Sequence, residues 1–286
     1  MTAEQYKIII SSGEKTFEIS PSSGAHLIEN GLSGFSSVGF DVSLCSYASQ
    51  SGGYAQKRRF AEREMKISFE IERDYNKALT RRLVSLLDPR KDCEIDITLG
   101  EVRRKITAIP CDEPVFSRPT FSDSTEVTLF FTAPSVFFRS HNEIASRLRE
   151  KRGLLTFPMN FTASAGLTSG VFFTHGSAEI ENPGDSECGL IITITACDGR
   201  VEKPAVHLGD RYILCPLTLD IGDTLVIDTR PRLKNIYLNG ERCFIFDKRS
   251  SFFSLPVGRS TVSVTCESGQ ENADTVIEFT PLYYGV

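Results

Sequence analysis

In the stretch EMKISFEIE, residues 64–72, apolar and polar side chains alternate, and this alternation indicates the fold class. Its apolar side chains recur at every second position, at Met65, Ile67, Phe69 and Ile71. An extended strand points successive side chains to opposite faces, so this spacing places all of them on one face. The stretch therefore predicts a β-strand with one buried face and one polar face.

Similar runs recur along the chain, separated by Gly, Pro, Asn and Asp, and this pattern is typical of antiparallel β-structure. In the first half, strands are expected at 6–10, 15–20, 94–99, 103–109 and 125–133. In the second half, strands are expected at 177–182, 190–197, 211–215, 223–229, 235–239, 242–246, 260–266 and 274–280. The protein is therefore expected to be mainly β.

One segment interrupts the strand pattern and predicts a helix over 75–88. Leucines recur there at helical spacing, Asp74 stands at the N-cap position, and Pro89 follows the end. A second segment, 139–157, also loses the alternation and carries five basic side chains. We interpret 141–157 as a connector between a first domain, 1–140, and a second domain, 158–286.

Composition excludes several classes of protein. Hydrophobic residues make up 40% and charged residues 24% of the 286 residues, as in folded globular proteins. A net charge of −5 argues against binding nucleic acid through a polycationic surface. The start of the chain resembles no secretory signal, and no apolar run is long enough to span a bilayer, so we expect synthesis in a cytoplasm and no membrane partner.

The residues that usually carry chemistry form no recognisable motif. Eight cysteines are spread without a C-x-x-C pair, and we expect them to be reduced, small core residues. Glycine-rich phosphate loops and the nucleophile elbow G-x-S-x-G are both missing, and the four histidines are far apart in sequence. The sequence therefore predicts no catalytic residue, no cofactor and no metal.

A basic run follows two glycines in SQSGGYAQKRRF, residues 49–60, which we interpret as a loop leading into the strand at Met65. Its cations are Lys57, Arg58 and Arg59, with Arg63 just beyond. Ordinary solvation is the first interpretation, and contact with a neighbouring subunit is the second. Nucleic acid ranks last, because few aromatic side chains accompany the charge.

Glycines mark the predicted turns of the second half. In NIYLNGERCF, residues 235–244, Asn239 and Gly240 suit the positive φ angles of a type I′ hairpin turn. Ile236, Leu238 and Phe244 are then expected in a sandwich core. Gly184 and Gly222 are expected to give backbone freedom to two further turns, in place of calcium loops.

Sugar binding is the main alternative function, because small β-sandwiches often bind carbohydrates. The chain has 8 Tyr and 20 Phe but no Trp, and its phenylalanines fall mainly in apolar runs such as LFFTAPSVFF, residues 129–138. These runs suggest core packing, so the sequence itself gives a carbohydrate-binding module no direct support.

The order of the motifs resembles the siphophage distal tail protein family. The motifs in the first half are SGGYAQKRRF (51–60), REMKISFEIE (63–72), the helical segment, KITAIP (105–110) and LFFTAPSVFFRS (129–140). Those in the second half are IENPGDSECGLIITITA (180–196), residues 219–244, SSFFSLPVGRSTVSVT (250–265), whose turn contains Gly258, and TVIEFTPLYYGV (275–286). The resemblance covers nearly the whole chain and is weakest over 1–40 and 141–175.

The resemblance alone implies an architecture and a function. The implied architecture is a β-sandwich or barrel-like ring domain with one helix, then a galectin-like C-terminal β-sandwich. The implied function is that of a non-enzymatic structural protein, which forms a homohexameric ring at the virion tail tip in a phage, a prophage or another tail-like machine. The implied partners are the tail tube, tape measure and tail-tip proteins, with receptor-binding proteins outside. On this resemblance, the loop at 50–60 is the candidate contact with a neighbouring subunit or with the tail tube, through Lys57, Arg58, Arg59 and Arg63. An uncharacterised hydrolase is the third and least supported hypothesis.

Overall fold

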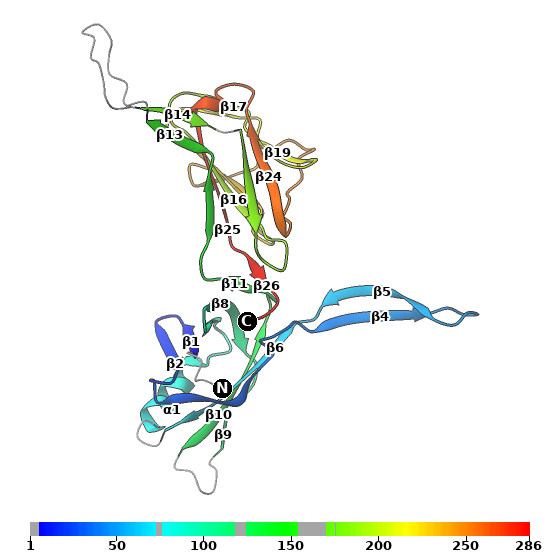
Figure 1. The fold of residues 1–286 in the computed structure, drawn as a ribbon, viewed down its shortest axis with the longest axis vertical. Coiled ribbons are helices and arrows are strands. Elements are labelled where there is room, and N and C mark those ends of the chain that lie inside the picture. The colour runs from blue at the N-terminus through cyan, green and yellow to red at the C-terminus, as the bar shows by residue number, and fades with distance from the viewer. Residues whose placement is uncertain (1–5, 73–75, 118–123, 154–169, 175) are drawn as a thin grey trace. The chain divides into compact units, whose positions relative to one another are not determined.

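A computed structural model describes residues 6–72, 76–117, 124–153, 170–174 and 176–286. The chain forms two compact units (Figure 1). Unit 1 contains residues 1–141 together with 282–286, and unit 2 contains residues 142–281. Both are built mainly from strands, which confirms the predicted fold class.

The elements of unit 1 are antiparallel strands and one helix. They are β1 (Tyr6–Ser12), β2 (Lys15–Ile19), β3 (Ala25–Ser33), β4 (Phe40–Ser46), β5 (Gly53–Phe60), β6 (Arg63–Ile71), α1 (Asn76–Leu86), β7 (Cys93–Leu99), β8 (Val102–Pro110), β9 (Val115–Ser117), β10 (Thr125–Ala133), β11 (Phe138–Ser140) and β26 (Leu282–Tyr283).

The main sheet of unit 1 has the strand order β2-β1-β7-β8-β10-β6-β3. Its two halves are joined by a short pairing of β8 with β10, and both contribute apolar side chains to one core. Phe17 of β2 and Phe69 of β6 have ring centroids 5.6 Å apart within that core. The alternation that begins at Met65 is confirmed, because Met65, Ile67 and Phe69 are buried.

Helix α1 covers the β2 side of this core. Leu83 and Leu86 are buried in it, and the side chain of Lys15 on β2 donates a hydrogen bond of 2.6 Å to the carbonyl oxygen of Ser85. The predicted helix is therefore confirmed. Its expected N-cap, Asp74, lies outside the described residues.

Unit 2 consists of two principal sheets of antiparallel strands, with shorter pairs beside them. Its elements are β12 (Ile144–Arg147), β13 (Arg149–Gly153), β14 (Gly170–Thr174), β15 (Ser177–Asn182), β16 (Leu190–Ala196), β17 (Val201–Glu202), β18 (Ala205–Leu208), β19 (Arg211–Leu214), β20 (Thr218–Leu219), β21 (Thr224–Asp228), β22 (Asn235–Leu238), β23 (Glu241–Cys243), β24 (Gly258–Thr265), the 3-10 helix η2 (Gln270–Asn272) and β25 (Ala273–Phe279).

One principal sheet has the order β12-β25-β16-β21-β22-β23, and the other has the order β15-β24-β18-β19. Both bury one set of alternating side chains. Ile192 and Ile227 are buried from the first sheet, and Val206 and Val262 are buried from the second. Two sheets that each bury one face form a β-sandwich.

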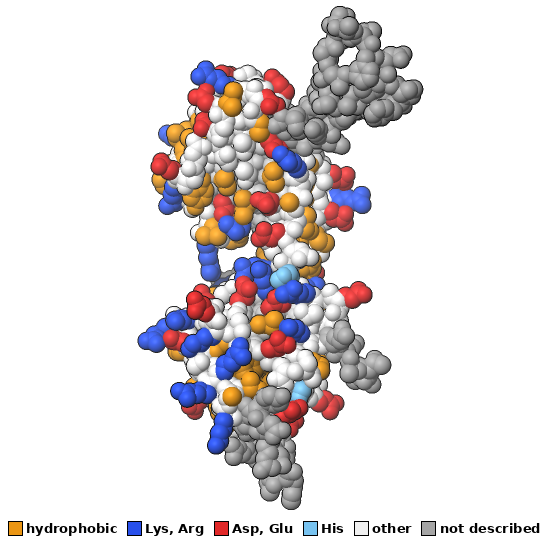
Figure 2. Space-filling view, turned by 90° about the vertical axis from the view of Figure 1, so that its left-hand side faces the viewer, with side chains coloured by type: hydrophobic (Ala, Val, Ile, Leu, Met, Phe, Trp, Pro, Cys, Tyr) orange, Lys and Arg blue, Asp and Glu red, His pale blue; other side chains and the backbone are white. Residues whose placement is uncertain are grey.

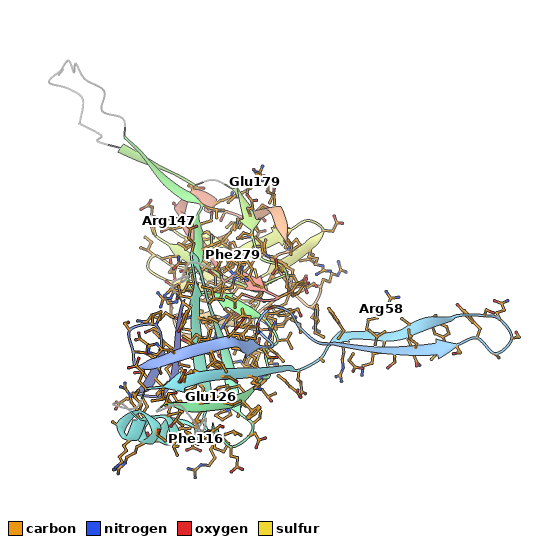
Figure 3. All side chains as sticks on the ribbon, turned by 60° about the horizontal axis from the view of Figure 1, so that its bottom comes forward. Arg58, Phe116, Glu126, Arg147, Glu179 and Phe279 are labelled. Carbon is orange, nitrogen blue, oxygen red and sulfur yellow. The ribbon has the colours of Figure 1, made fainter. Side chains whose placement is uncertain are left out.

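The domain boundaries differ from those expected. Residues 144–147, placed in a connector by the sequence, form β12 and pair with β25. Arg147, which is labelled in Figure 3, makes an ion pair there with Asp274, with 2.8 Å between Nε and Oδ1. Residues 282–286, expected in the second domain, return to unit 1, where β26 pairs with β11. Because β12 lies at the edge of its sheet and is partly exposed, its sequence lacks a clear apolar alternation and resembles a connector.

Candidate assembly surface

Strands β4 and β5 form a two-stranded sheet that pairs with no other described strand (Figure 1). Phe40 lies opposite Phe60, and the pairing continues to Ser46 opposite Gly53, with a register shift between Ser43 and Leu44. We call residues 40–60 the hairpin. The sequence predicted a loop over 49–60, which is wrong from Gly53 onward because β5 begins there.

The hairpin exposes large apolar side chains. Phe40, Val42 and Leu44 alternate along β4 and are 74%, 52% and 75% exposed. No residue of the hairpin is buried. An isolated two-stranded hairpin is at best marginally stable in water, and exposed apolar patches typically mark interaction sites. The hairpin therefore has the character of a surface that a partner covers.

The predicted basic residues lie on different faces of the hairpin. Directly opposite residues in an antiparallel pair share a face, so Arg58, opposite Val42, lies on the apolar face. Arg59 and Lys57 lie on the other face, opposite Asp41 and Ser43. Figure 3 shows Arg58 on the hairpin, with no other described element beside it.

Asp41 pairs with the two cations on that second face. Its Oδ2 lies 2.6 Å from Nε of Arg59 and 4.0 Å from Nζ of Lys57. The hydrogen bond and charge of Arg59 hold the pKa of Asp41 below its usual value. Arg58 has no ion-pair partner among the residues that the structure describes, so its charge is free to meet an acidic group outside the chain.

Arg63 is the predicted contact residue that the structure corrects. Its side chain is 1% exposed, so it cannot touch a neighbouring subunit. It donates hydrogen bonds to the backbone carbonyls of Val136 (2.8 Å), Ser37 (3.2 Å), Gly34 and Tyr284. Charge alone suggested a surface residue, but Arg63 holds together the segments at the base of the hairpin.

Aromatic side chains complete that base. The ring of Phe60 lies 5.5 Å from the ring of Phe137 and 5.3 Å from the ring of Tyr284. The guanidinium of Arg63 lies 4.7 Å from the ring centre of Phe138. Burial lowers the pKa of Arg63 to about 10, which leaves it charged at neutral pH. The hairpin is therefore exposed along its length but firmly attached where it begins.

The predicted turns of unit 2 are partly confirmed. Asn239 and Gly240 both have positive φ, 52° and 83°, and Gly222 and Gly258 also have positive φ. Gly184 does not, and its amide donates instead to the side chain of Asn182 (3.0 Å). Leu238, which was predicted to lie in the core, is only half-buried.

The predicted core position of Phe244 is wrong, whereas that of Ile236 is confirmed. Ile236 is buried, but Phe244 is 68% exposed. Cys243, the last residue of β23, lies opposite buried Ile236 and so shares its core face, which leaves the next residue, Phe244, directed outward.

Metal clusters and membrane-spanning helices are not found in the part of the chain that the structure describes. Groups of three or more His, Cys, Asp or Glu side chains that could hold a metal are not found there. Among the described helices, none is long and apolar enough to cross a membrane. On the face drawn in Figure 2, basic and acidic side chains are interspersed, so no single-sign field marks a nucleic-acid groove there.

Comparison with known proteins finds a family match over residues 183–283 and a fold match over nearly the whole chain. Residues 183–283 match the family model described as the siphovirus-type tail component, C-terminal domain. The fold is similar to that of the SPP1 Dit protein, which is described as a paradigm of the hub adsorption apparatus in phages that infect Gram-positive bacteria. That match has a TM-score of 0.69 and 13% identity, and covers 96% of this chain and 98% of the other.

A chain of the phage P2 baseplate in its activated conformation with Ca is also similar, with a TM-score of 0.49, 10% identity and coverage of 96% of this chain and 98% of that one. No curated protein sequence matches the chain. The resemblance to distal tail proteins is confirmed, by sequence over 183–283 and by fold over nearly the whole chain.

Proposed function

We propose that the protein is the structural hub at the tip of a phage tail, and that unit 1 assembles into a homohexameric ring through the hairpin. The match to a tail component family supports a structural role in a tail or baseplate. The observation that carries the assembly step is the exposed apolar face of the hairpin, formed by Phe40, Val42 and Leu44.

In this proposal, the hairpin of one copy contacts a different surface on the next copy. Such head-to-tail contacts generate a closed ring when the rotation from each copy to the next adds up to a full turn. The apolar face would be covered by the neighbouring copy, and Arg58 would meet an acidic group there. The net charge of −5 makes acidic partners plentiful on other copies.

In this proposal, the ring joins the tail tube to the tail-tip and tape measure proteins, and unit 2 carries adsorption or receptor-binding proteins on its outside. The protein would be made in the bacterial cytoplasm and would act at the virion tail tip without a catalytic step. The rival hydrolase hypothesis gains no support from the family match, which is to a tail component.

The proposal is tested by the mass of the full-length protein in size-exclusion chromatography with light scattering. We expect a species of about six times the 31.8 kDa chain mass, with rings in negative-stain images. The double substitution Val42→Asp and Leu44→Asp should convert it to monomer without lowering the melting temperature, because neither side chain is in a core.

The matched control is Val115→Asp on β9, because Val115 is 50% exposed but lies away from the hairpin. This control should keep the oligomer. A hairpin variant that retains the wild-type mass would contradict assembly through the hairpin, and a wild-type monomer that stays monomeric with purified tail partners would contradict the ring itself.

A further inference from the structure

The outward face of the sheet β15-β24-β18-β19 carries a group of polar and aromatic side chains that the hub role does not explain. In this sheet, Val206, Ile213 and Val264 point into the core. The alternate positions point outward, and the register sets His207 opposite Tyr212 and Ala205 opposite Thr265. The pleat of the strands therefore gathers these side chains on one surface.

These side chains line an open pocket of about 420 Å³, within the usual size range of small-molecule sites. Its aromatic wall is formed by His207 and Tyr212, with ring centres 6.0 Å apart. Lys203, Glu267 and Thr265 supply its polar groups, and Leu214 adds apolar surface. The pocket thus combines flat rings with hydrogen-bonding groups.

Both rings are held in place by hydrogen bonds. The hydroxyl of Tyr212 donates to Oδ2 of Asp247 (3.1 Å), and Nε2 of His207 lies 2.9 Å from Oγ1 of Thr265. Partial burial and the bond to Asp247 raise the pKa of Tyr212, so its phenol stays protonated and neutral. A ligand would therefore meet an aromatic surface that is already positioned.

The charges of the pocket neutralise each other. Nζ of Lys203 lies 2.6 Å from Oε2 of Glu267, and this contact raises the pKa of Lys203. A donor thus stands beside an acceptor. Neighbouring hydroxyl groups of one ligand can accept from Lys203 and donate to Glu267, whereas an anion or cation would meet an unfavourable charge beside the favourable one.

The backbone of Lys203, one of the residues that line the pocket, has a rare conformation. Lys203 has φ of 45°, a left-handed conformation that few non-glycine residues adopt, and its amide donates to the carbonyl oxygen of Leu217 (2.8 Å). Such backbone strain persists only where the surroundings enforce it, and it clusters at functional sites. Here it belongs to the residue that contributes the pocket's cation.

We propose that this pocket binds a neutral saccharide. One face of the sugar ring, which presents C–H groups, packs on Tyr212 and His207, and two adjacent hydroxyl groups bind Lys203 and Glu267. The site lies entirely within unit 2, so the inference goes beyond the hub role and stands whether or not unit 1 forms a ring.

Ligand-observed saturation-transfer NMR on the full-length protein tests the proposal. The probes are the methyl glycosides of glucose, galactose and N-acetylglucosamine, with a blocked triglycine peptide as the comparison ligand. We expect at least one glycoside to bind saturably, with a dissociation constant on the order of 1 mM, and the peptide to give no signal.

Tyr212→Ala and Glu267→Gln should each weaken that binding about tenfold, the size of one aromatic or hydrogen-bonding contact. The matched controls are Tyr237→Ala, on the other sheet, and Glu181→Gln, whose carboxylate pairs with Arg259 on the same sheet. Both controls should bind like the wild type, and all variants should keep the wild-type melting temperature.

Three results would overturn the proposal. They are saturable binding of none of the three glycosides, unchanged affinity in Tyr212→Ala, and equal loss in the Tyr237→Ala control. Preference for the peptide over every glycoside would instead assign the pocket to a protein partner. None of these results depends on the oligomer mass, so failure here is distinguishable from failure of the hub proposal.

Discussion

The guanidinium of Arg63 donates a hydrogen bond to the backbone carbonyl of Tyr284, 221 residues further along the chain. Arg104 donates similarly to the backbone carbonyl of Gly285, and the amide of Val286 donates a hydrogen bond of 3.0 Å to the carbonyl oxygen of Phe35. The last residues of the chain are therefore structural parts of unit 1, at the point where the hairpin begins.

Replacing Arg63 by Met should destabilise unit 1 by about 3 kcal/mol, because buried carbonyl groups lose a charged donor. Urea unfolding monitored by circular dichroism measures the change. Arg90→Met is the control, because the Arg90 side chain is 87% exposed, and this substitution should leave the urea unfolding midpoint close to that of the wild type. Equal effects of the two substitutions would show that burial of Arg63 contributes nothing.

Charge reversal on the hairpin should distinguish its two faces. The double variant Arg58→Glu and Arg59→Glu should weaken ring assembly, and Arg58→Glu alone should account for most of the loss, about tenfold or more in the dissociation constant. Arg59→Glu should have a smaller effect because Arg59 is already paired with Asp41 on the opposite face. Sedimentation velocity over a dilution series measures both, and an unchanged mass in the double variant would contradict the contact.

Replacing Gly240 by Val should destabilise unit 2 by about 1–2 kcal/mol, because a β-branched residue is strained at φ of 83°. Nothing else obstructs a side chain there, so the backbone conformation is the whole effect. Glu241→Val, at the next, exposed position, is the control. If differential scanning calorimetry gave the same melting temperature for Gly240→Val as for the wild type, the turn assignment would be wrong.

Thiol labelling should separate the cysteines by burial. Cys188 and Cys215 are buried, and burial raises the pKa of each to about 12. A raised pKa keeps a thiol protonated, so at pH 8 neither should react with iodoacetamide in the native protein, whereas the exposed Cys111 should react. Mass spectrometry of labelled peptides reports each site, and labelling in denaturant is the control that makes every cysteine reactive. Rapid native labelling of Cys215 would contradict its core position.

Local patterns in the sequence predicted the regular elements well. The alternation around Met65, the leucine spacing of α1 and the Asn239-Gly240 turn all appear in the structure, because each depends on neighbouring residues. Sequence reasoning missed β4, although Phe40, Val42 and Leu44 alternate there too. The glycines and the basic run of 49–60 suggested a loop, because such residues occur in loops as well as in exposed hairpin strands.

Local residue patterns were enough to show that the chain is mainly β, to place most strands and the helix, and to identify the family that its motifs resemble. Which side chains face water depended on the tertiary structure. Arg63 and Arg58 are the same residue type five positions apart, yet one is buried among carbonyl groups from distant segments and the other is exposed on the hairpin. Likewise, His207, Tyr212 and Glu267 meet in one pocket only because strand pairing brings them together. Burial and convergence depend on long-range contacts, which a local pattern does not contain.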